Sequence, residues 1–163
     1  MINTDERELY YILEQLKIKY IRYEHKPVYT VEEADNLDID IPGQHCKNLF
    51  LRNKKGNIHY LIIADSEKQI DLKSLSKQIG STGLSFASEE RLYKHLGLKP
   101  GAVTPFGLIN DIEKNVIVLI DKKLTDKSIV NFHPNVNTAT ISVSYNDLER
   151  FIRWHENKFI YID

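Results

Sequence analysis

Cysteine is almost absent from this chain of 163 residues, because Cys46 is the only one. One thiol excludes an intrachain disulfide and any zinc site made of several cysteines, and it is typical of a reducing compartment. No apolar run approaches the roughly 20 residues that span a membrane. The acidic, amphipathic start, MINTDERELYYILEQL, is unlike a secretion signal. We therefore expect a cytoplasmic protein without a membrane partner.

The chain also lacks an excess of charge of either sign, since 22 Lys and Arg face 23 Asp and Glu. A net charge of −1 gives no chain-wide attraction to nucleic acid, and no DNA partner is expected. Any docking of a polyanion must use a local patch. The candidates are the 52–55 segment, with Arg52, Lys54 and Lys55, or the pair Lys122 and Lys123. Each is equally typical of ordinary solvated turns.

Several chemical signatures are missing as well. The six histidines show no metal-ligand spacing, and the chain has no phosphate-binding Walker loop, no dinucleotide fingerprint and no serine nucleophile elbow. We therefore expect no metal and no cofactor. The adjacent His45 and Cys46 do not make a nucleophilic pair, because neighbours on a strand point to opposite faces.

The length predicts one domain, residues 1–163, and its patterns predict a mixed α/β fold. Capping residues and apolar spacing indicate helices at 4–17, 31–37, 71–79, 88–97 and 144–155. Alternating or strongly apolar runs indicate strands at 20–25, 48–52, 58–64, 84–86, 116–121, 139–143 and 159–162, with a hairpin loop at 53–57. The irregular alternation of strands and helices favours a mixed sheet with helices packed around it.

The segment 97–108, GLKPGAVTPFGL, holds three of the seven glycines and two of the five prolines. Glycine lets the backbone approach a neighbour closely and proline fixes φ, so the segment predicts a stiff, shaped loop. Such a loop can present backbone N–H groups to a ligand. It can equally be a rigid connector.

Two further segments hold candidate functional residues. In HCKNLFLR (45–52), Lys47 stands at the mouth of an apolar strand, where its ammonium either binds an anion or simply ends the strand at the surface. In FHPNVNTATISV (132–143), His133 precedes a strand, where it either orients a substrate near neutral pH or only shapes a turn.

These three segments, in this order, resemble the YbaK/prolyl-tRNA editing family, and most closely its free-standing members that hydrolyse alanyl-tRNA(Pro). The likeness runs from about Tyr20 to Trp154. It implies a curved mixed sheet that approaches a barrel, with helices around it. It also implies catalytic roles for Lys47, which would position the tRNA 3′ end, for His133, and for the backbone at Gly101. Family members often have serine where this chain has Ala102, so no hydroxyl is available here and a role for this position would come from its backbone.

The resemblance also implies which residues bind the substrate. Val28, Tyr29 and Thr30 would form the pocket entry, although they could equally form a strand-to-helix corner. The amides and hydroxyls after His133 could hold the amino acid or the ribose, or only satisfy local backbone groups. The full predicted binding set is Val28, Tyr29, Thr30, Phe50, Ala102, Val103, Thr104, Pro105, Asn137, Thr138 and Thr140.

The function implied is hydrolysis of mischarged alanyl-tRNA(Pro) in trans, with the aminoacyl end of tRNA(Pro) as partner and prolyl-tRNA synthetase as a second possible partner. Rejecting a missing methylene by binding alone is worth only about 1–3 kcal/mol, so a separate hydrolytic site is needed. Two alternatives stay open: a deacylase for cysteinyl-tRNA(Pro) or another mischarged tRNA, and a non-catalytic module that binds a tRNA end or a synthetase.

Overall fold

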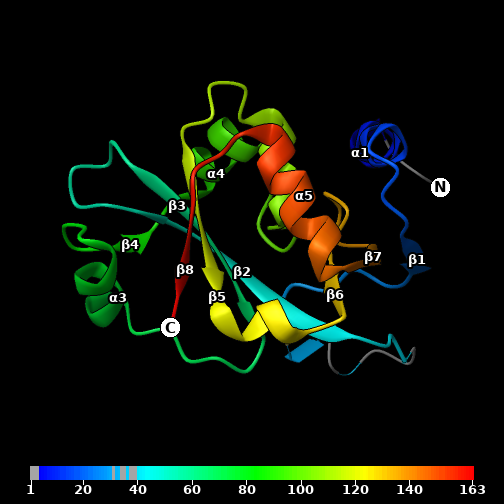
Figure 1. Cartoon of the computed structure of the whole chain (residues 1–163). Helices are drawn as coiled ribbons and strands as arrows, with labels where there is room; N and C mark the ends of the chain where they lie inside the picture. Colours follow the sequence, from blue (N-terminus) through cyan, green and yellow to red (C-terminus); the bar gives the residue numbers. More distant parts are fainter. Residues whose placement is uncertain (1–3, 31, 34–35, 37–39) are drawn as a thin grey trace.

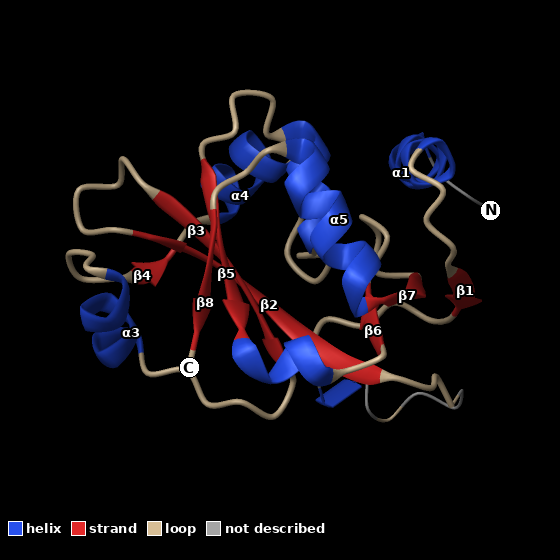
Figure 2. Ribbon diagram, viewed as in Figure 1, coloured by secondary structure: helices blue, strands red, loops and turns tan. Residues whose placement is uncertain are grey.

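A computed structural model describes residues 4–30, 32–33, 36 and 40–163. The chain alternates strands and helices around one mixed sheet (Figures 1 and 2). The α-helices are α1 (Thr4–Gln15), α3 (Leu72–Ile79), α4 (Glu89–Leu96) and α5 (Tyr145–His155), and the 3₁₀ helices are η1 (Pro105–Asn110) and η2 (Lys122–Asp126). The strands are β1 (Ile21–Glu24), β2 (Gln44–Arg52), β3 (His59–Asp65), β4 (Ser85–Phe86), β5 (Val116–Asp121), β6 (Ile129–Phe132), β7 (Ala139–Ser144) and β8 (Phe159–Ile162).

The sheet has the strand order β1-β7-β6-β2-β3-β5-β8, and β4 adds to β2 beside this path. The β2–β3 hairpin is antiparallel, as are β1 with β7 and β6 with β7. The pairs β2–β6, β3–β5 and β5–β8 are parallel. The mixed α/β class is therefore confirmed. Among the described residues the edge strands β1 and β8 do not pair with each other, so the twisted sheet stays open.

Two hydrophobic clusters bury the two faces of the sheet. The larger contains apolar side chains of α1, α4, η1 and α5, with Phe106 and Phe151 packed edge to face at 5.2 Å. The smaller places Leu75 of α3 against Leu51 and Ile62. Figure 1 shows α4 and α5 together over one face, with α3 next to β4 at one end and α1 next to β1 at the other. The helices hold the sheet rigid on both sides.

The predicted helix ends are confirmed at α3, α4 and α5. Ser88 and Ser144 each accept a backbone N–H of the first helical turn, and Gly80 and Gly97 end their helices with positive φ. The predicted helix at 31–37 lies largely outside the described residues. Within the described part, Glu32 and Glu33 are helical. There Thr30 Oγ1 accepts the Glu33 N–H at 3.0 Å, as the capping motif predicts.

Two sheet elements differ from the sequence-based expectation, and both matter for the site. Strand β2 begins at Gln44, four residues before the predicted strand, and β6 was not predicted at all. Both differences have one cause: the first residues of β2 are strand because β6 pairs with them, through Gln44 with Val130 and His45 with Asn131. Such long-range parallel pairing leaves little local pattern in the sequence.

Candidate functional site

Strand β2 has a stretch of open edge, and a cavity lies along it. On one side β2 pairs with β3 from Cys46 to Arg52. On the other side β6 pairs only with the first two residues, and β4 pairs only with Leu51 and Arg52. Residues 46–50 thus have no strand partner on that edge among the described residues. The His45 carbonyl accepts the Ser66 N–H on the β3 edge, and the Phe50 carbonyl accepts the Ala87 N–H on the opposite edge. Because successive residues of a strand direct their N–H and C=O groups to alternate edges, those of Asn48 face the same edge as Phe50, toward the gap.

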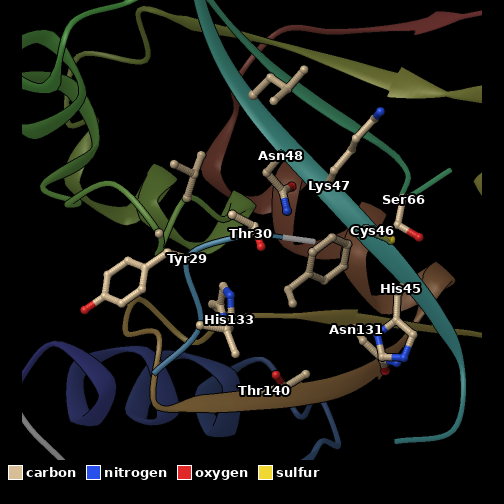
Figure 3. Close-up of a pocket in the computed structure, with 15 residues that line it drawn as sticks. Tyr29, Thr30, His45, Cys46, Lys47, Asn48, Ser66, Asn131, His133 and Thr140 are labelled. Carbon is tan, nitrogen blue, oxygen red and sulfur yellow. The ribbon is translucent and has the colours of Figure 1, made fainter. Parts of the chain in front are cut away.

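The cavity has a volume of about 250 Å³. Its wall is built from β2, β6, β7, the 28–30 segment after β1, and the segments before α3 and η1 (Figure 3). The lining residues are Val28, Tyr29, Thr30, His45, Cys46, Lys47, Asn48, Leu49, Ser66, Gly101, Val103, Asn131, Phe132, His133 and Thr140. No carboxylate occurs among these described lining residues, so the cavity suits a ligand that brings its own negative charge at one end.

The three predicted catalytic positions meet here, since Lys47, His133 and Gly101 all line this one cavity. They come from β2, from the end of β6 and from the loop before η1, which are distant in sequence. The predicted binding residues Val28, Tyr29, Thr30, Val103 and Thr140 line it too. The structure therefore brings together eight of the fourteen predicted positions, and the roles assigned to them stay predictions.

Gly101 fits only because it is glycine. Its φ is +88°, and a Cβ built there would lie 2.8 Å from Cδ1 of Tyr29 and 3.5 Å from the Asn137 amide nitrogen. The loop therefore presses directly against the 28–30 segment. The N–H groups of Gly101 and Val103 donate to no acceptor among the described residues, whereas the Ala102 N–H donates to Lys99 O at 3.1 Å.

The other residues of the loop hold it in place. Thr104 is fully buried and accepts the Phe106 N–H, so it caps η1, and Pro105 opens that helix from a buried position. Ala102 is buried as well. None of the three lines the cavity. Within the predicted glycine-to-proline wall, only Gly101 and Val103 face the cavity.

Three further predicted binding residues also lie outside the cavity lining. Phe50 belongs to the core and stacks on His59 at 5.5 Å, since it faces the larger hydrophobic cluster. Thr138 is exposed because β7 begins only at Ala139, so it does not share a strand face with Thr140. Asn137 fastens the wall instead: its amide donates to Val28 O at 3.2 Å, and its carbonyl accepts the Val28 N–H.

His133 is held as a neutral ring. Its Nδ1 lies 3.0 Å from Ala139 O, and a carbonyl only accepts, so Nδ1 carries the proton and Nε2 keeps its lone pair. Burial lowers the pKa of His133 most; the bond to Ala139 O opposes this and the nearby His25 adds to it. At neutral pH the ring is thus an acceptor at Nε2, not a cation.

Lys47 and Asn48 leave β2 on opposite sides. In Figure 3 the Asn48 amide points toward His133 and Thr140, while the Lys47 side chain extends the other way. Lys47 forms no ion pair or hydrogen bond with any described residue. Asn48 Oδ1 is buried and has no partner among them either. Orphaned buried polar atoms are rare, so Asn48 becomes a candidate ligand contact that the sequence analysis did not identify.

Cys46 is no nucleophile candidate in this setting. Burial raises the pKa of its thiol to about 12, so it stays protonated at neutral pH. Within the described part of the chain, no group of three or more His, Cys, Asp or Glu could hold a metal ion. The described helices include none long and apolar enough to cross a membrane.

The site is a small cavity on an open strand edge that brings together Lys47, His133 and Gly101, which are the positions that the resemblance to aminoacyl-tRNA editing hydrolases predicted. Comparison with known proteins agrees, because the model of the aminoacyl-tRNA editing domain matches residues 25–151. The chain belongs to this family, as the resemblance predicted, and is an aminoacyl-tRNA deacylase by class.

Curated relatives cover nearly the whole chain. The prolyl-tRNA editing protein ProX of Acetoanaerobium sticklandii is 52% identical over 147 residues, which is 90% of each chain. The prolyl-tRNA synthetase associated domain-containing protein 1 of Danio rerio is 34% identical and covers 90% of this chain and 80% of its own.

Two solved structures share the fold. A crystal structure of hypothetical protein APE2540 superposes with a TM-score of 0.72 at 17% identity, covering 93% of this chain and 96% of its own. A protein provisionally described as a trans-editing enzyme for prolyl tRNA synthetase gives 0.70 at 18%, covering 99% and 98%. At such identities the likeness shows the fold alone.

Proposed function

We propose that this protein hydrolyses alanyl-tRNA(Pro) in trans. The observation that carries the proposal is the convergence of Lys47, His133 and Gly101 on one cavity. The relationship to a prolyl-tRNA editing protein over 90% of the chain favours tRNA(Pro) as the nucleic acid. The size of the cavity and its lining favour alanine as the amino acid.

The cavity favours a small acyl group. Its 250 Å³ is below the roughly 300–1,000 Å³ of sites for drug-sized ligands. Apolar contact comes from Val28, Leu49, Val103 and Phe132, which suit a methyl side chain. The space must also take part of the terminal ribose, so little volume is left for a proline ring. A size limit of this kind removes alanine from tRNA(Pro) and spares the correct product.

The opposite directions of Lys47 and Asn48 suit the two ends of an aminoacyl-adenosine. On one side, the Lys47 ammonium, which has no partner among the described residues, binds the terminal phosphate or ribose electrostatically. On the other side, His133 and its neighbours meet the aminoacyl group. The free N–H groups of Gly101 and Val103 stabilise the carbonyl oxygen as negative charge develops on it.

The reaction is ester hydrolysis. A water oxygen attacks the carbonyl carbon, the bond to the ribose 3′ oxygen breaks, and a proton passes to that oxygen. The carboxylic acid formed then ionises and releases one proton to solvent. No lining side chain is a strong base, so the adjacent 2′ hydroxyl of the ribose assists the proton transfer, while the enzyme supplies orientation and a tight site.

Docking of the acceptor stem is best served by the 53–57 hairpin. Arg52 and Arg91 both lie against Gly56, and neither they nor Lys54 form an ion pair with a described residue. Lys122, in the alternative patch, is already paired with Asp163 at 2.9 Å. The Arg52 and Arg91 guanidinium groups donate to hairpin carbonyls and so hold their charge beside this loop, which favours phosphate contacts there. A prolyl-tRNA synthetase that delivers the tRNA is a compatible partner.

A deacylation panel tests the proposal. The protein is incubated with tRNA(Pro) charged with Ala, Cys, Ser or Pro, and loss of the ester is followed. We expect turnover of the alanyl ester and none of the prolyl ester. Faster turnover of the cysteinyl ester would assign the protein to the alternative deacylase, and binding without turnover would make it a non-catalytic module.

Lys47→Ala tests the assignment of the ammonium, with Lys73→Ala, an exposed lysine of α3, as the matched control. We expect the first to lose at least about 100-fold in kcat/KM while its unfolding transition is unchanged, because Lys47 has no contact that supports the fold. The control should behave as the parent protein. Equal activity of the two variants would remove Lys47 from its proposed role.

A further inference from the structure

His25 lies next to the cavity and determines whether the Thr140 hydroxyl donates or accepts its hydrogen bond to the imidazole ring. Its Nδ1 lies 2.8 Å from Lys26 O, and its Nε2 lies 2.8 Å from Thr140 Oγ1. Because the carbonyl only accepts, Nδ1 carries the ring proton. In the neutral ring Nε2 is then an acceptor, and the Thr140 hydroxyl must donate to it. The remaining capacity of Oγ1, two lone pairs, is left for the cavity.

Two more acceptors lie on the same side of the cavity. Nε2 of His133 has a lone pair, because Nδ1 of that ring donates to Ala139 O. Oδ1 of Asn48 is buried without a partner among the described residues. Figure 3 shows the Asn48 side chain extending from β2 toward His133, with Thr140 on β7 farther along in the same direction.

Three neutral acceptors lie on this side of the cavity, and because the His133 and Thr140 protons are already donated, the Asn48 amide nitrogen is the one side-chain donor left among these three residues. A hydroxyl or a water would donate at most one or two bonds to such a group and would need a donor in return. An ammonium donates three hydrogen bonds and accepts none. Its charge strengthens each of them, so neutral acceptors suffice without a carboxylate.

We propose that Thr140, His133 and Asn48 bind the α-ammonium of the aminoacyl group, and that His25 is a positioning residue that keeps Thr140 an acceptor. This rests on the proposed function, since it takes the ligand to be an aminoacyl ester. The enzyme then selects its substrate by the α-ammonium as well as by the size of the amino-acid side chain. An ester whose amine is replaced by a hydroxyl is a poor substrate even though it fits.

Lactyl-tRNA(Pro) is the probe, because it differs from alanyl-tRNA(Pro) only by a hydroxyl in place of the ammonium. Rates on both esters are divided by their spontaneous hydrolysis rates, which removes the effect of the ammonium on ester reactivity. We expect a normalised preference for the alanyl ester of about 10- to 100-fold, expressed mainly in KM, as for a charge-assisted hydrogen bond. Equal normalised rates would overturn the inference and leave the deacylase function standing. Hydrolysis of neither ester would overturn the proposed function itself.

Matched variants test the individual residues. Thr140→Val should lose the preference and Thr140→Ser should keep it, with Thr125→Val in the exposed helix η2 as a control for a threonine outside the cavity. His25→Leu should lose the preference, whereas His25→Gln, whose amide oxygen can accept from Thr140, should restore it. A full preference in Thr140→Val or His25→Leu would refute the assigned roles.

The parent protein gives a test that needs no variant to fold. Nitrogen-15 NMR of the imidazole rings reports which nitrogen carries the proton. In the neutral rings of both His25 and His133 we expect the proton on Nδ1 and none on Nε2. A protonated Nε2 at His25 would make Thr140 a donor to the cavity and would overturn the proposal.

Discussion

Replacing Gly101 by alanine should separate the stability of the fold from the function of the site. The backbone there has φ of +88°, which costs a residue with a side chain about 1–2 kcal/mol. The new Cβ would also meet Cδ1 of Tyr29 at 2.8 Å. The Tyr29 side chain is 66% exposed, so it can rotate away at small cost. The loss in unfolding free energy should therefore be about 1–2 kcal/mol, dominated by the backbone.

Gly80 supplies the control. Its φ is +70°, and a Cβ there would meet nothing within 4 Å. Gly80→Ala should thus cost the same 1–2 kcal/mol, or about 2–8 °C in Tm for a chain of this size. Only Gly101→Ala should impair deacylation, because it displaces Tyr29 and the loop N–H groups at the cavity. Misplacement by about 1 Å can cost 100-fold in rate, and we expect a loss of about 10- to 100-fold in kcat/KM.

The measurements are urea unfolding and single-turnover deacylation of alanyl-tRNA(Pro) for both variants. Similar stabilities with a selective loss of activity in Gly101→Ala are expected. Full activity in Gly101→Ala would show that the close approach of the loop to Tyr29 has no part in the reaction. A much larger stability loss at Gly101 than at Gly80 would show that Tyr29 cannot yield, contrary to its exposure.

Three further predictions concern charge. The pKa of His59 is lowered from 6.5 to about 4, mainly by burial and then by the nearby His95 and Arg91. Between pH 6.5 and 4 the unfolded chain therefore binds more protons than the folded chain, so the free energy of unfolding falls as the pH falls. His59→Phe should reduce the loss of unfolding free energy between pH 7 and 4.5 by about 1–2 kcal/mol. This is less than the full 1.36 kcal/mol for each unit of pKa shift, because solvent screens part of the site. An unchanged pH dependence of stability would contradict this prediction. Arg22→Met should cost about 3 kcal/mol in urea unfolding, since it removes the guanidinium that lies 2.9 Å from the buried Glu6 carboxylate, to which the Tyr10 hydroxyl also donates. A cost under about 1 kcal/mol would argue against a strong pair. Because burial lowers the pKa of His133, kcat/KM should fall only below pH 6.5, and a decline that begins above it would show a protonated ring in the active form.

Local patterns were sufficient for most of the fold. The strand Val116–Asp121 has the predicted bounds, and Ser144 begins α5 through the predicted hydrogen bond. Such elements carry their own signal, because apolar runs and caps act within a few residues. Strand β6 carries none: it has four residues, includes the polar Asn131, and is a strand because β2 and β7 lie on either side of it.

The site was predictable in part, and for a different reason. Lys47, His133 and Gly101 were identified by their resemblance to family motifs, not by periodicity. Asn48 had no such signal, because its importance comes from an open edge and an unpartnered oxygen that exist only in the folded chain. Thr138 was named through the resemblance; β7 begins at Ala139, as predicted, so Thr138 stands before the strand and does not line the cavity.

The proline after His133 explains why the open edge exists. Strand β6 ends at Phe132, and Pro134 has no N–H to continue a parallel ladder with β2. Had β6 continued, it would have covered the Asn48 peptide groups and filled the cavity with its own side chains. The same two residues therefore end one strand, leave its neighbour unpaired, and turn the His133 ring so that Nδ1 reaches Ala139 O. The His-Pro turn therefore helps to create the space that the His133 side chain lines.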